Sequence, residues 1–239
     1  RTVMRIYSIK LALLIGLGSA TIASAADIVG KVTLKGAKPK EIQINMATDP
    51  KCGALHTEPV FTRFYATAPD GGLADVLVYI KSGLENKEWP APEKNALLDQ
   101  KGCEYVPYVM GVQAGQTIEI RNSDPTLHNV HATPKINKEF NFAQPVQGMV
   151  TKKSFDKPEM PVRFKCDVHP WMFAYVGVFD HPFFATTDEK GNFKISNVPE
   201  GKYTLIAYHR KTHNTQEGVA QEVTVDGSGA KAEFTVELK

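Results

Sequence analysis

Four side chains that can bind a soft metal ion occur in two short stretches of this sequence. Cys166, His169 and Met172 follow one another at intervals of three residues, and His128 lies upstream. A thiolate, two imidazoles and a thioether make up the ligand set of a trigonal copper site with a weak axial methionine. Such a site keeps nearly one geometry in Cu(I) and Cu(II). These residues therefore predict one mononuclear copper centre that exchanges single electrons.

The local sequence predicts that a loop, and not a helix, carries the three downstream ligands. Pro170 directly follows His169, and a proline inside a helix removes a hydrogen bond and clashes with the preceding turn. Residues 160–166 alternate apolar and polar side chains, and residues 173–179 also have the composition of a strand. We therefore expect the loop to lie at the end of a β-sheet, with His128 reaching it from another strand end.

These stretches resemble the ligand motifs of the cupredoxin family, in particular amicyanin and plastocyanin-like proteins of the methylamine-utilisation type. Such proteins carry a short Cys-x-x-His-Pro-x-Met loop and a His-Asn-Val-His segment. The matching residues here are Cys166, His169, Pro170 and Met172, together with 128–131. The resemblance covers residues 100–182 and implies a Greek-key β-sandwich. It also implies that His128, and not His131, is the first ligand, with Asn129 supporting the site.

Alternative roles for the same residues stay open at the level of sequence. A single histidine is more often a surface or core residue than a ligand, and a cysteine can simply be buried. Zinc also accepts thiolate and imidazole ligands, but it rarely takes methionine. Because all four candidate ligands fall beside strand-like segments, copper is the favoured metal.

The first 26 residues have the pattern of a secretory signal peptide. A basic start from Met4 precedes an apolar run at 11–17, and residues 23–25 (Ala-Ser-Ala) provide a cleavage site of small residues. The apolar run is too short for a transmembrane anchor, which needs about 20 residues. We expect the mature chain to begin at Ala26 or Asp27, to have no membrane span, and to be periplasmic or secreted.

Net charge gives no reason to expect a nucleic-acid partner. The full sequence has a formal charge of +2. Loss of the signal peptide removes Arg1, Arg5 and Lys10 and no acidic residue, so the charge becomes 2 − 3 = −1. A nearly neutral chain lacks the basic surface that phosphate recognition requires.

The three cysteines divide into one ligand and one pair. If Cys166 binds copper, Cys52 and Cys103 remain. In an oxidising compartment two such cysteines should form a disulfide, although two buried free thiols would also fit. The disulfide would connect the N-terminal segment to the start of the copper domain.

Outside the ligand motifs the sequence predicts an all-β protein with a second sandwich. Short apolar runs separated by turn residues recur along the chain, while residues 84–98 indicate a connecting loop with at most one helical turn. Residues 187–207 resemble the carboxypeptidase regulatory-like (transthyretin-like) β-sandwich, through Asp-x-x-Gly-x-Phe followed by Pro-x-Gly-x-Tyr-x-Leu. Asp and Gly supply the turn, and Phe193 and Ile195 should face a core.

Four parts of the chain are therefore expected. They are the signal peptide at 1–26, an N-terminal β segment at 27–99, the cupredoxin domain at 100–182, and the regulatory-like sandwich at 183–239. The N-terminal segment would contribute to the regulatory-like sandwich, so that the copper domain is inserted into it. This second sandwich has no zinc-peptidase motif, and His209 and His213 indicate only a surface pair.

Electron transfer is the function that these residues favour. Lys165 and Asp167 flank Cys166, so the His-Cys-His run that links the copper sites of multicopper oxidases is missing. A binuclear site needs a second nearby cysteine, which the motif does not offer. We expect no enzymatic activity, but electron exchange between periplasmic redox proteins that dock beside Pro170 and Trp171. A copper carrier, or a cell-envelope binding module, is the alternative.

Overall fold

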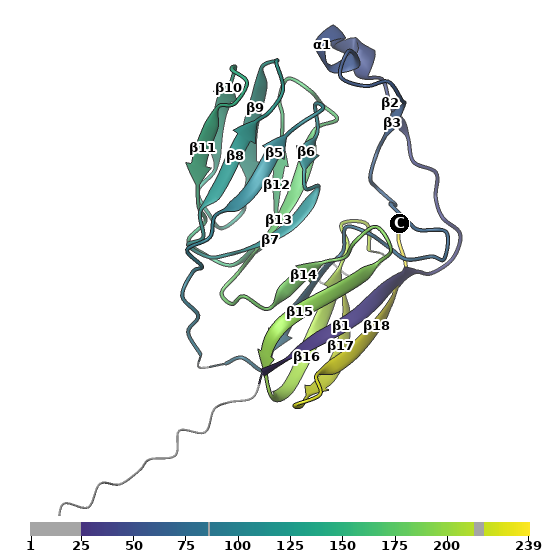
Figure 1. Ribbon diagram of the computed structural model, residues 1–239, viewed down its shortest axis with the longest axis vertical. Helices are drawn as coiled ribbons and strands as arrows, with labels where there is room; N and C mark the ends of the chain where they lie inside the picture. The colour runs from purple at the N-terminus through teal and green to yellow at the C-terminus, as the bar shows by residue number, and fades with distance from the viewer. Residues whose placement is uncertain (1–24, 86, 213–217) are drawn as a thin grey trace, which may run out of the picture.

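The computed structural model describes residues 25–85, 87–212 and 218–239, and strands dominate these ranges. They form two β-sandwiches, which lie one above the other in Figure 1. The all-β prediction is thus confirmed. Most of the expected signal peptide lies outside the described residues, and strand β1 (Ala25–Leu34) begins at the two residues that end it. Within the described ranges no helix has the length and apolar character needed to cross a membrane.

The predicted metal ligands belong to the first sandwich, the upper one in Figure 1. Its larger sheet contains, in spatial order, β10 (Phe140–Gln144), β9 (His128–Thr133), β12 (Glu159–Lys165), β13 (Phe173–Phe179) and β7 (Val109–Gln113). Its smaller sheet contains β11 (Val150–Lys153), β8 (Ile118–Asn122), β5 (Ala96–Gln100) and β6 (Tyr105–Val106). Apolar side chains of both sheets pack into one buried core, which also includes Cys166 and Met172.

The second sandwich combines strands from both ends of the described chain. One sheet has the order β15 (Asn192–Pro199), β1 and β18 (Ala230–Val236). The other has the order β14 (Phe184–Thr186), β4 (Leu77–Ser82), β16 (Gly201–Tyr208) and β17 (Val219–Val225). The strands of the first sandwich all fall between β4 and β14 in sequence. The exact domain limits stay a prediction, and β5, which crosses the expected limit at 99, pairs with β8.

The turn motif of the second sandwich folds as its residues predict. The carboxylate of Asp188 accepts hydrogen bonds from the N–H groups of Lys190 and Asn192, and Gly191 adopts a positive φ of 79°. Glycine is favoured there because other side chains are strained in that region. The following side chains Phe193 and Ile195 are 5% and 1% exposed, so the expected core face is confirmed.

Two local expectations were wrong, those for the loop at 84–98 and for His209. The predicted loop ends before residue 96, where β5 begins. His209 is buried at 1% exposure and not at the surface, whereas His213 lies outside the described residues.

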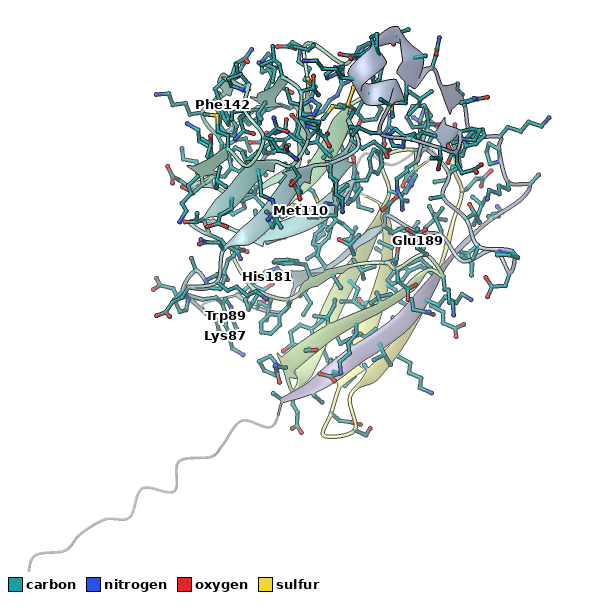
Figure 2. The ribbon with its side chains drawn as sticks, turned by 45° about the horizontal axis from the view of Figure 1, so that its top comes forward. Lys87, Trp89, Met110, Phe142, His181 and Glu189 are labelled. Carbon is teal, nitrogen blue, oxygen red and sulfur yellow. A yellow bond between two sulfur atoms is a disulfide. The ribbon has the colours of Figure 1, made fainter. Side chains whose placement is uncertain are left out.

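An apolar junction connects the two sandwiches. Leu77 of β4 forms a buried cluster with Val109 of β7 and Phe179 of β13. The rings of Tyr79 and Phe179 lie 4.9 Å apart, between the same sandwiches. Figure 2 shows His181 in this region, where its Nε2–H donates to the carbonyl oxygen of Ile80 at 2.8 Å. The chain passes between the two sandwiches after β4 and again before β14. Packed aromatic and aliphatic side chains join the sandwiches in addition to these two connections.

A small substructure lies between β1 and β4 in sequence and was not predicted. It contains β2 (Gln43–Ile44), a 3-10 helix η1 (Met46–Thr48), a short helix α1 (Pro50–Gly53) and β3 (Val60–Phe61). Among the strands that the structure describes, β2 and β3 pair with each other and with no other strand. The buried Cys52 of α1 belongs to the core cluster of the first sandwich. This segment therefore packs onto the first sandwich although it precedes the second sandwich's β4 in sequence.

Candidate metal centre

His128 is placed by the first residue of β9. Side chains alternate between the two faces of a strand, so His128 shares the inward face with Val130 and Ala132. All three are fully buried. His131 has the opposite parity and bonds at the surface, to Asp167 at 2.9 Å and Glu139 at 2.7 Å. The strand therefore directs only one of these two histidines inward.

The downstream ligands lie on the loop between β12 and β13, as the sequence predicts. Two backbone hydrogen bonds close this loop: the N–H of Cys166 donates to the oxygen of Met172 at 3.0 Å, and the N–H of Met172 to the oxygen of His169 at 2.9 Å. The strands on either side pair with each other up to Lys165 and Phe173. The loop is thus held at both ends, which fixes the positions of its side chains.

Three of the four predicted ligands converge on one small volume. The Nδ1 atoms of His128 and His169 are 3.1 Å apart, and the Sγ atom of Cys166 is 3.7 Å from the Nδ1 atom of His169. One ligand atom from each of the three residues lies within 4.8 Å of the other two. All three side chains are at most 3% exposed. The group is therefore shielded from bulk water.

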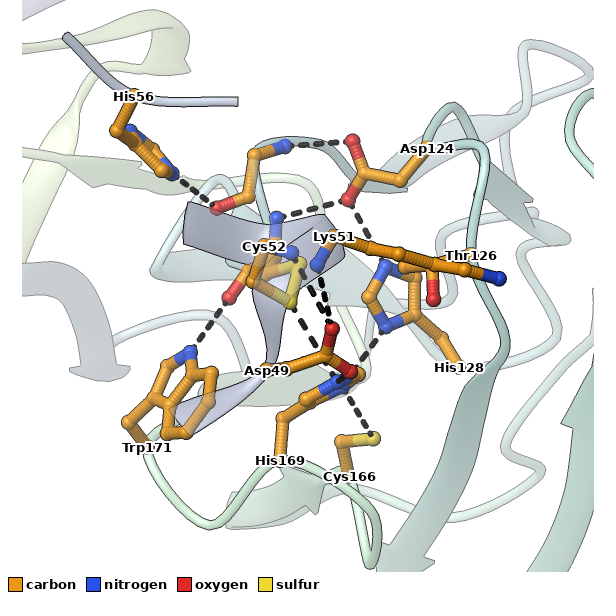
Figure 3. The surroundings of a disulfide bond; sticks show 12 residues. Asp49, Lys51, Cys52, His56, Asp124, Thr126, His128, Cys166, His169 and Trp171 are labelled. Carbon is orange, nitrogen blue, oxygen red and sulfur yellow. Dashed lines mark hydrogen bonds and ion pairs between the residues drawn. A yellow bond between two sulfur atoms is a disulfide. The ribbon is translucent and has the colours of Figure 1, made fainter. Parts of the chain in front are cut away.

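The Nε2 atom of each imidazole is hydrogen-bonded to a carboxylate (Figure 3). The Nε2 atom of His128 is 2.8 Å from Asp124 Oδ2, and the Nε2 atom of His169 is 3.0 Å from Asp49 Oδ2. An ionised carboxylate can only accept hydrogen bonds, so both Nε2 atoms carry a proton. In the neutral rings both Nδ1 lone pairs then face Cys166. Carboxylate–histidine pairs of this kind orient metal-binding histidines in many proteins.

The charges of the site are set by burial and by these hydrogen bonds. Burial alone would raise the pKa of the Cys166 thiol, but His128 and the N–H groups of Asn129, His169 and Val168 outweigh it and lower the pKa to about 7. Burial would lower the pKa of His128, yet the bond to Asp124 raises it. The pKa of Asp49 is lowered, first by His169 and then by N–H donors of α1. The thiolate and both carboxylates are thus readily formed.

Two separations between the donor atoms are close to those found around a bound metal ion. Zinc, whose bond lengths are well defined, binds nitrogen at about 2.0 Å and sulfur at about 2.3 Å, which puts neighbouring ligand atoms at roughly 3.3–3.8 Å. The separations here are 3.1 Å between the two Nδ1 atoms and 3.7 Å between Cys166 Sγ and His169 Nδ1. The residues therefore fit a mononuclear ion with only small adjustments. Spacing does not distinguish copper from zinc, and that distinction depends on the chemistry of the ligands.

The other predicted site residues lie around this group. Met172 is 1% exposed and belongs to the same core cluster as Cys166, and its role as an axial ligand stays a prediction. Asn129 supports Cys166, because its backbone N–H donates to Sγ at 3.3 Å. Pro170 is exposed and Trp171 is half-buried, with its Nε1–H donating to the oxygen of Cys103 at 3.0 Å. Their role in docking also stays a prediction.

Cys52 and Cys103 form the expected disulfide, and Cys166 is the free cysteine. The disulfide lies much closer to the predicted metal ligands than the sequence suggests, with Cys52 Sγ 3.5 Å from His169 Nε2 (Figure 3). The expectation that no second cysteine lies near the site was therefore wrong, because Cys52 is distant from His169 in sequence but close to it in the fold. In the disulfide, however, neither sulfur is a thiolate, and the thiolate is the form that binds metals.

Sequence reasoning missed the two carboxylates. Asp124 lies four residues before His128, but nothing in that spacing identifies it as a partner. Asp49 is 120 residues away from His169 in sequence. One signal was present: Asp followed by Pro is a typical helix start, and the expected Cys52–Cys103 disulfide would bring that start close to the copper domain.

Comparisons with known proteins give matches to parts of the chain. A family model described as polysaccharide lyase family 4, domain II, matches residues 179–234, which overlap the expected regulatory-like sandwich under a different family description. No curated protein matches the sequence.

Several solved structures are similar to a part of this chain. A purple cupredoxin from Nitrosopumilus maritimus is 21% identical with a TM-score of 0.31, over 35% of this chain and 99% of its own. A mutant of amicyanin in its Cu(I) form is 21% identical with a TM-score of 0.32, over 42% of this chain and 97% of its own. A copper-containing nitrite reductase from Thermus scotoductus SA-01 is 19% identical with a TM-score of 0.31, over 39% of this chain but only 25% of its own. We base the assignment of the site on this chain's own residues.

Proposed function

We propose that this protein is a periplasmic or secreted type 1 copper protein that carries single electrons between redox partners. The convergence of Cys166 with the Nδ1 atoms of His128 and His169 carries this proposal. Because carboxylates hold the protons on the Nε2 atoms, two nitrogen lone pairs and a thiolate face one another without a donor between them. Such an arrangement is stable only with a cation among the three atoms, either a proton or a metal ion.

The residues divide the work of a type 1 site among them. The residues that would hold the ion are Cys166 as the strong thiolate donor, His128 and His169 as imidazole donors, and Met172 as a weak thioether donor. Copper, when bound there, would supply a one-electron couple. The chain's contribution is rigidity: strand ends, loop hydrogen bonds and outer carboxylates hold the ligands in one geometry. Little rearrangement is then needed when the charge of the site changes.

Partners would approach the ligand loop from its exposed side. Pro170 is exposed there, and the Trp171 ring lies 5.2 Å from the His169 ring. Transient redox complexes bury small areas, so a modest apolar patch is sufficient. We assign the chain no catalytic step and no nucleic-acid or membrane partner.

A copper carrier or cell-envelope binding module is the second candidate. A carrier must release its ion to another protein, which requires ligands that the recipient can reach. Here the four predicted ligands are between 0% and 3% exposed. This burial favours an ion that stays in place while electrons move.

The test is the optical spectrum of the full chain, purified from the periplasm, stripped of metal and loaded with one equivalent of Cu(II). We expect an intense thiolate-to-copper absorption that ascorbate removes and mild oxidation restores. Cys166→Ser should abolish the absorption, whereas Val168→Ser, at an exposed position of the same loop, should keep it. A protein that binds Cu(I) but stays colourless on oxidation would instead be a carrier, and one that prefers zinc would refute the copper assignment.

A further inference from the structure

A short segment that is distant in sequence covers the Nε2 side of His169. It consists of η1, Asp49 and α1. Asp49 Oδ2 lies 3.0 Å from His169 Nε2, and Cys52 Sγ lies 3.5 Å from the same atom (Figure 3). His169 is consequently 1% exposed, although the next residue, Pro170, faces solvent. The segment therefore closes this side of the candidate metal centre.

The two carboxylate oxygens of Asp49 have different partners. Oδ1 accepts the N–H groups of Lys51 at 2.8 Å and Cys52 at 3.4 Å, which makes Asp49 the N-cap of α1. Oδ2 accepts the Nε2–H of His169. One side chain thus begins the helix and holds the imidazole at the same time, so the position of α1 determines the position of the carboxylate.

The disulfide connects this arrangement to the other histidine. Cys52 of α1 is bonded to Cys103, and the N–H of Cys103 donates to Asp124 Oδ2 at 2.8 Å. The same oxygen atom accepts the Nε2–H of His128. The carboxylates behind both histidines are therefore linked through a single disulfide, which ties α1 to the first sandwich.

We propose that Asp49 is a positioning residue of the metal centre. We also propose that α1, tethered by the Cys52–Cys103 disulfide, is the element that holds Asp49 against His169. This inference rests on the proposed copper-binding function. By accepting the Nε2–H, Asp49 keeps Nδ1 unprotonated, directs it toward Cys166, and makes the imidazole a stronger donor. A stronger donor favours Cu(II) over Cu(I), so Asp49 lowers the reduction potential of the site.

The substitution Asp49→Asn separates the two roles of this residue. Asparagine is as good an N-cap as aspartate, but it places an NH₂ group where Oδ2 accepted the histidine proton. We expect the variant to keep the wild-type thermal stability and one free thiol. Its Cu(II) affinity should fall roughly 10–100-fold, with a smaller loss for Cu(I). Each tenfold difference between the two losses corresponds to a potential about 59 mV higher.

Two further variants make this result specific. Asp49→Ser should reproduce it, because serine can also cap α1 but offers no second oxygen. Glu58→Gln removes the same charge from an exposed position between α1 and β3 and should change neither affinity nor potential. If Asp49→Asn and Asp49→Ser fold normally and leave the potential and both affinities unchanged, Asp49 has no positioning role.

A measurement on metal-free protein distinguishes failure of this inference from failure of the copper proposal. Long-range ¹H–¹⁵N spectra at one fixed pH report which nitrogen of His169 carries the proton. We expect Nε2–H in the wild type and a shift toward Nδ1–H in Asp49→Asn. If this shift occurs but no copper binds, the proposed function fails and the positioning role stands. If the proton stays on Nε2 in the variant, the positioning role is overturned whether or not copper binds.

Discussion

The Sγ atom of Cys52 lies 3.5 Å from the Nε2 atom of His169, so a disulfide is in direct contact with a predicted copper ligand. The contact brings together residues 117 positions apart in the sequence. Disulfides in exported proteins are usually considered only for their stabilising effect. Here the bond also helps to hold the segment that covers the imidazole, because it joins Cys52 of α1 covalently to Cys103.

Removing the disulfide should therefore affect both stability and access. The double substitution Cys52→Ser and Cys103→Ser opens a covalent connection across 51 residues, and we expect the free energy of unfolding to fall by about 2–4 kcal/mol. With α1 released, added imidazole should reach the Cu(II) site faster than in the wild type. Denaturant titration and the change of the thiolate absorption with imidazole measure these effects. Equal rates in both proteins would show that α1 stays in place without its tether.

The assignment of His128 over His131 is tested by substituting each histidine. His128→Ala should remove one ligand and weaken Cu(II) binding. The loss should exceed the roughly 10–100-fold loss that is typical when a residue hydrogen-bonded to a ligand is substituted. His131→Ala should leave the absorption intact, because its ring bonds to Asp167 and Glu139 at the surface; its cost in stability should be within about 1 kcal/mol. Copper titrations followed by absorption compare the two. The opposite result would make the ligand assignment wrong.

The sequence predicted those features that depend on local pattern. The ligand loop between two strands follows from Cys166, His169 and Met172 with Pro170 and the strand-like segments on both sides. The buried positions of Phe193 and Ile195 follow from alternation after a turn. In each case neighbouring residues determine both the backbone and the direction of the side chains, so a short stretch is sufficient.

The features that were missed depend on contacts between distant segments. Asp49 reaches His169 because a disulfide and a four-residue helix bring it there, and neither produces a periodic pattern. His209 belongs to a segment with Arg210 and Lys211, which suggests a surface, yet the fold buries its ring. A polar residue whose role is to orient another side chain produces no recognisable pattern in a single sequence.

Asp124 should matter more to stability than Asp49, because its side chain is 4% exposed and that of Asp49 is 29% exposed. Its carboxylate accepts the N–H groups of Gly102 and Cys103 and the Nε2–H of His128. Asp124→Asn would direct an NH₂ group at one of these donors, and a buried donor without an acceptor costs about 1–3 kcal/mol. We also expect a roughly 10–100-fold loss of Cu(II) affinity. Denaturant and copper titrations measure the two effects.

The exposed Asp156 provides the matched control for this prediction. Asp156→Asn removes the same charge and should leave both the free energy of unfolding and the copper affinity close to the wild-type values. An Asp124→Asn protein with the stability and affinity of this control would mean that the carboxylate contributes nothing to the site.

The buried His209 should make the protein lose stability in mild acid, independently of the metal centre. Burial, followed by the charges of Arg210 and Lys211, lowers the pKa of His209 from 6.5 to about 3. Between these values the unfolded chain binds a proton that the folded chain does not, so the free energy of unfolding falls as the pH falls below about 6.5. The slope from this residue is at most about 1.4 kcal/mol for each pH unit.

The substitution His209→Asn isolates this contribution. Asparagine does not titrate, and its side-chain oxygen can replace Nδ1 as the acceptor for the N–H of Lys211, which is 3.2 Å away. Denaturant titrations of metal-free protein at about pH 7 and about pH 5 should show that the wild type loses about 2 kcal/mol more than the variant between these conditions. Parallel losses in the two proteins would show that His209 takes up its proton in the folded state, and that its ring is accessible to water.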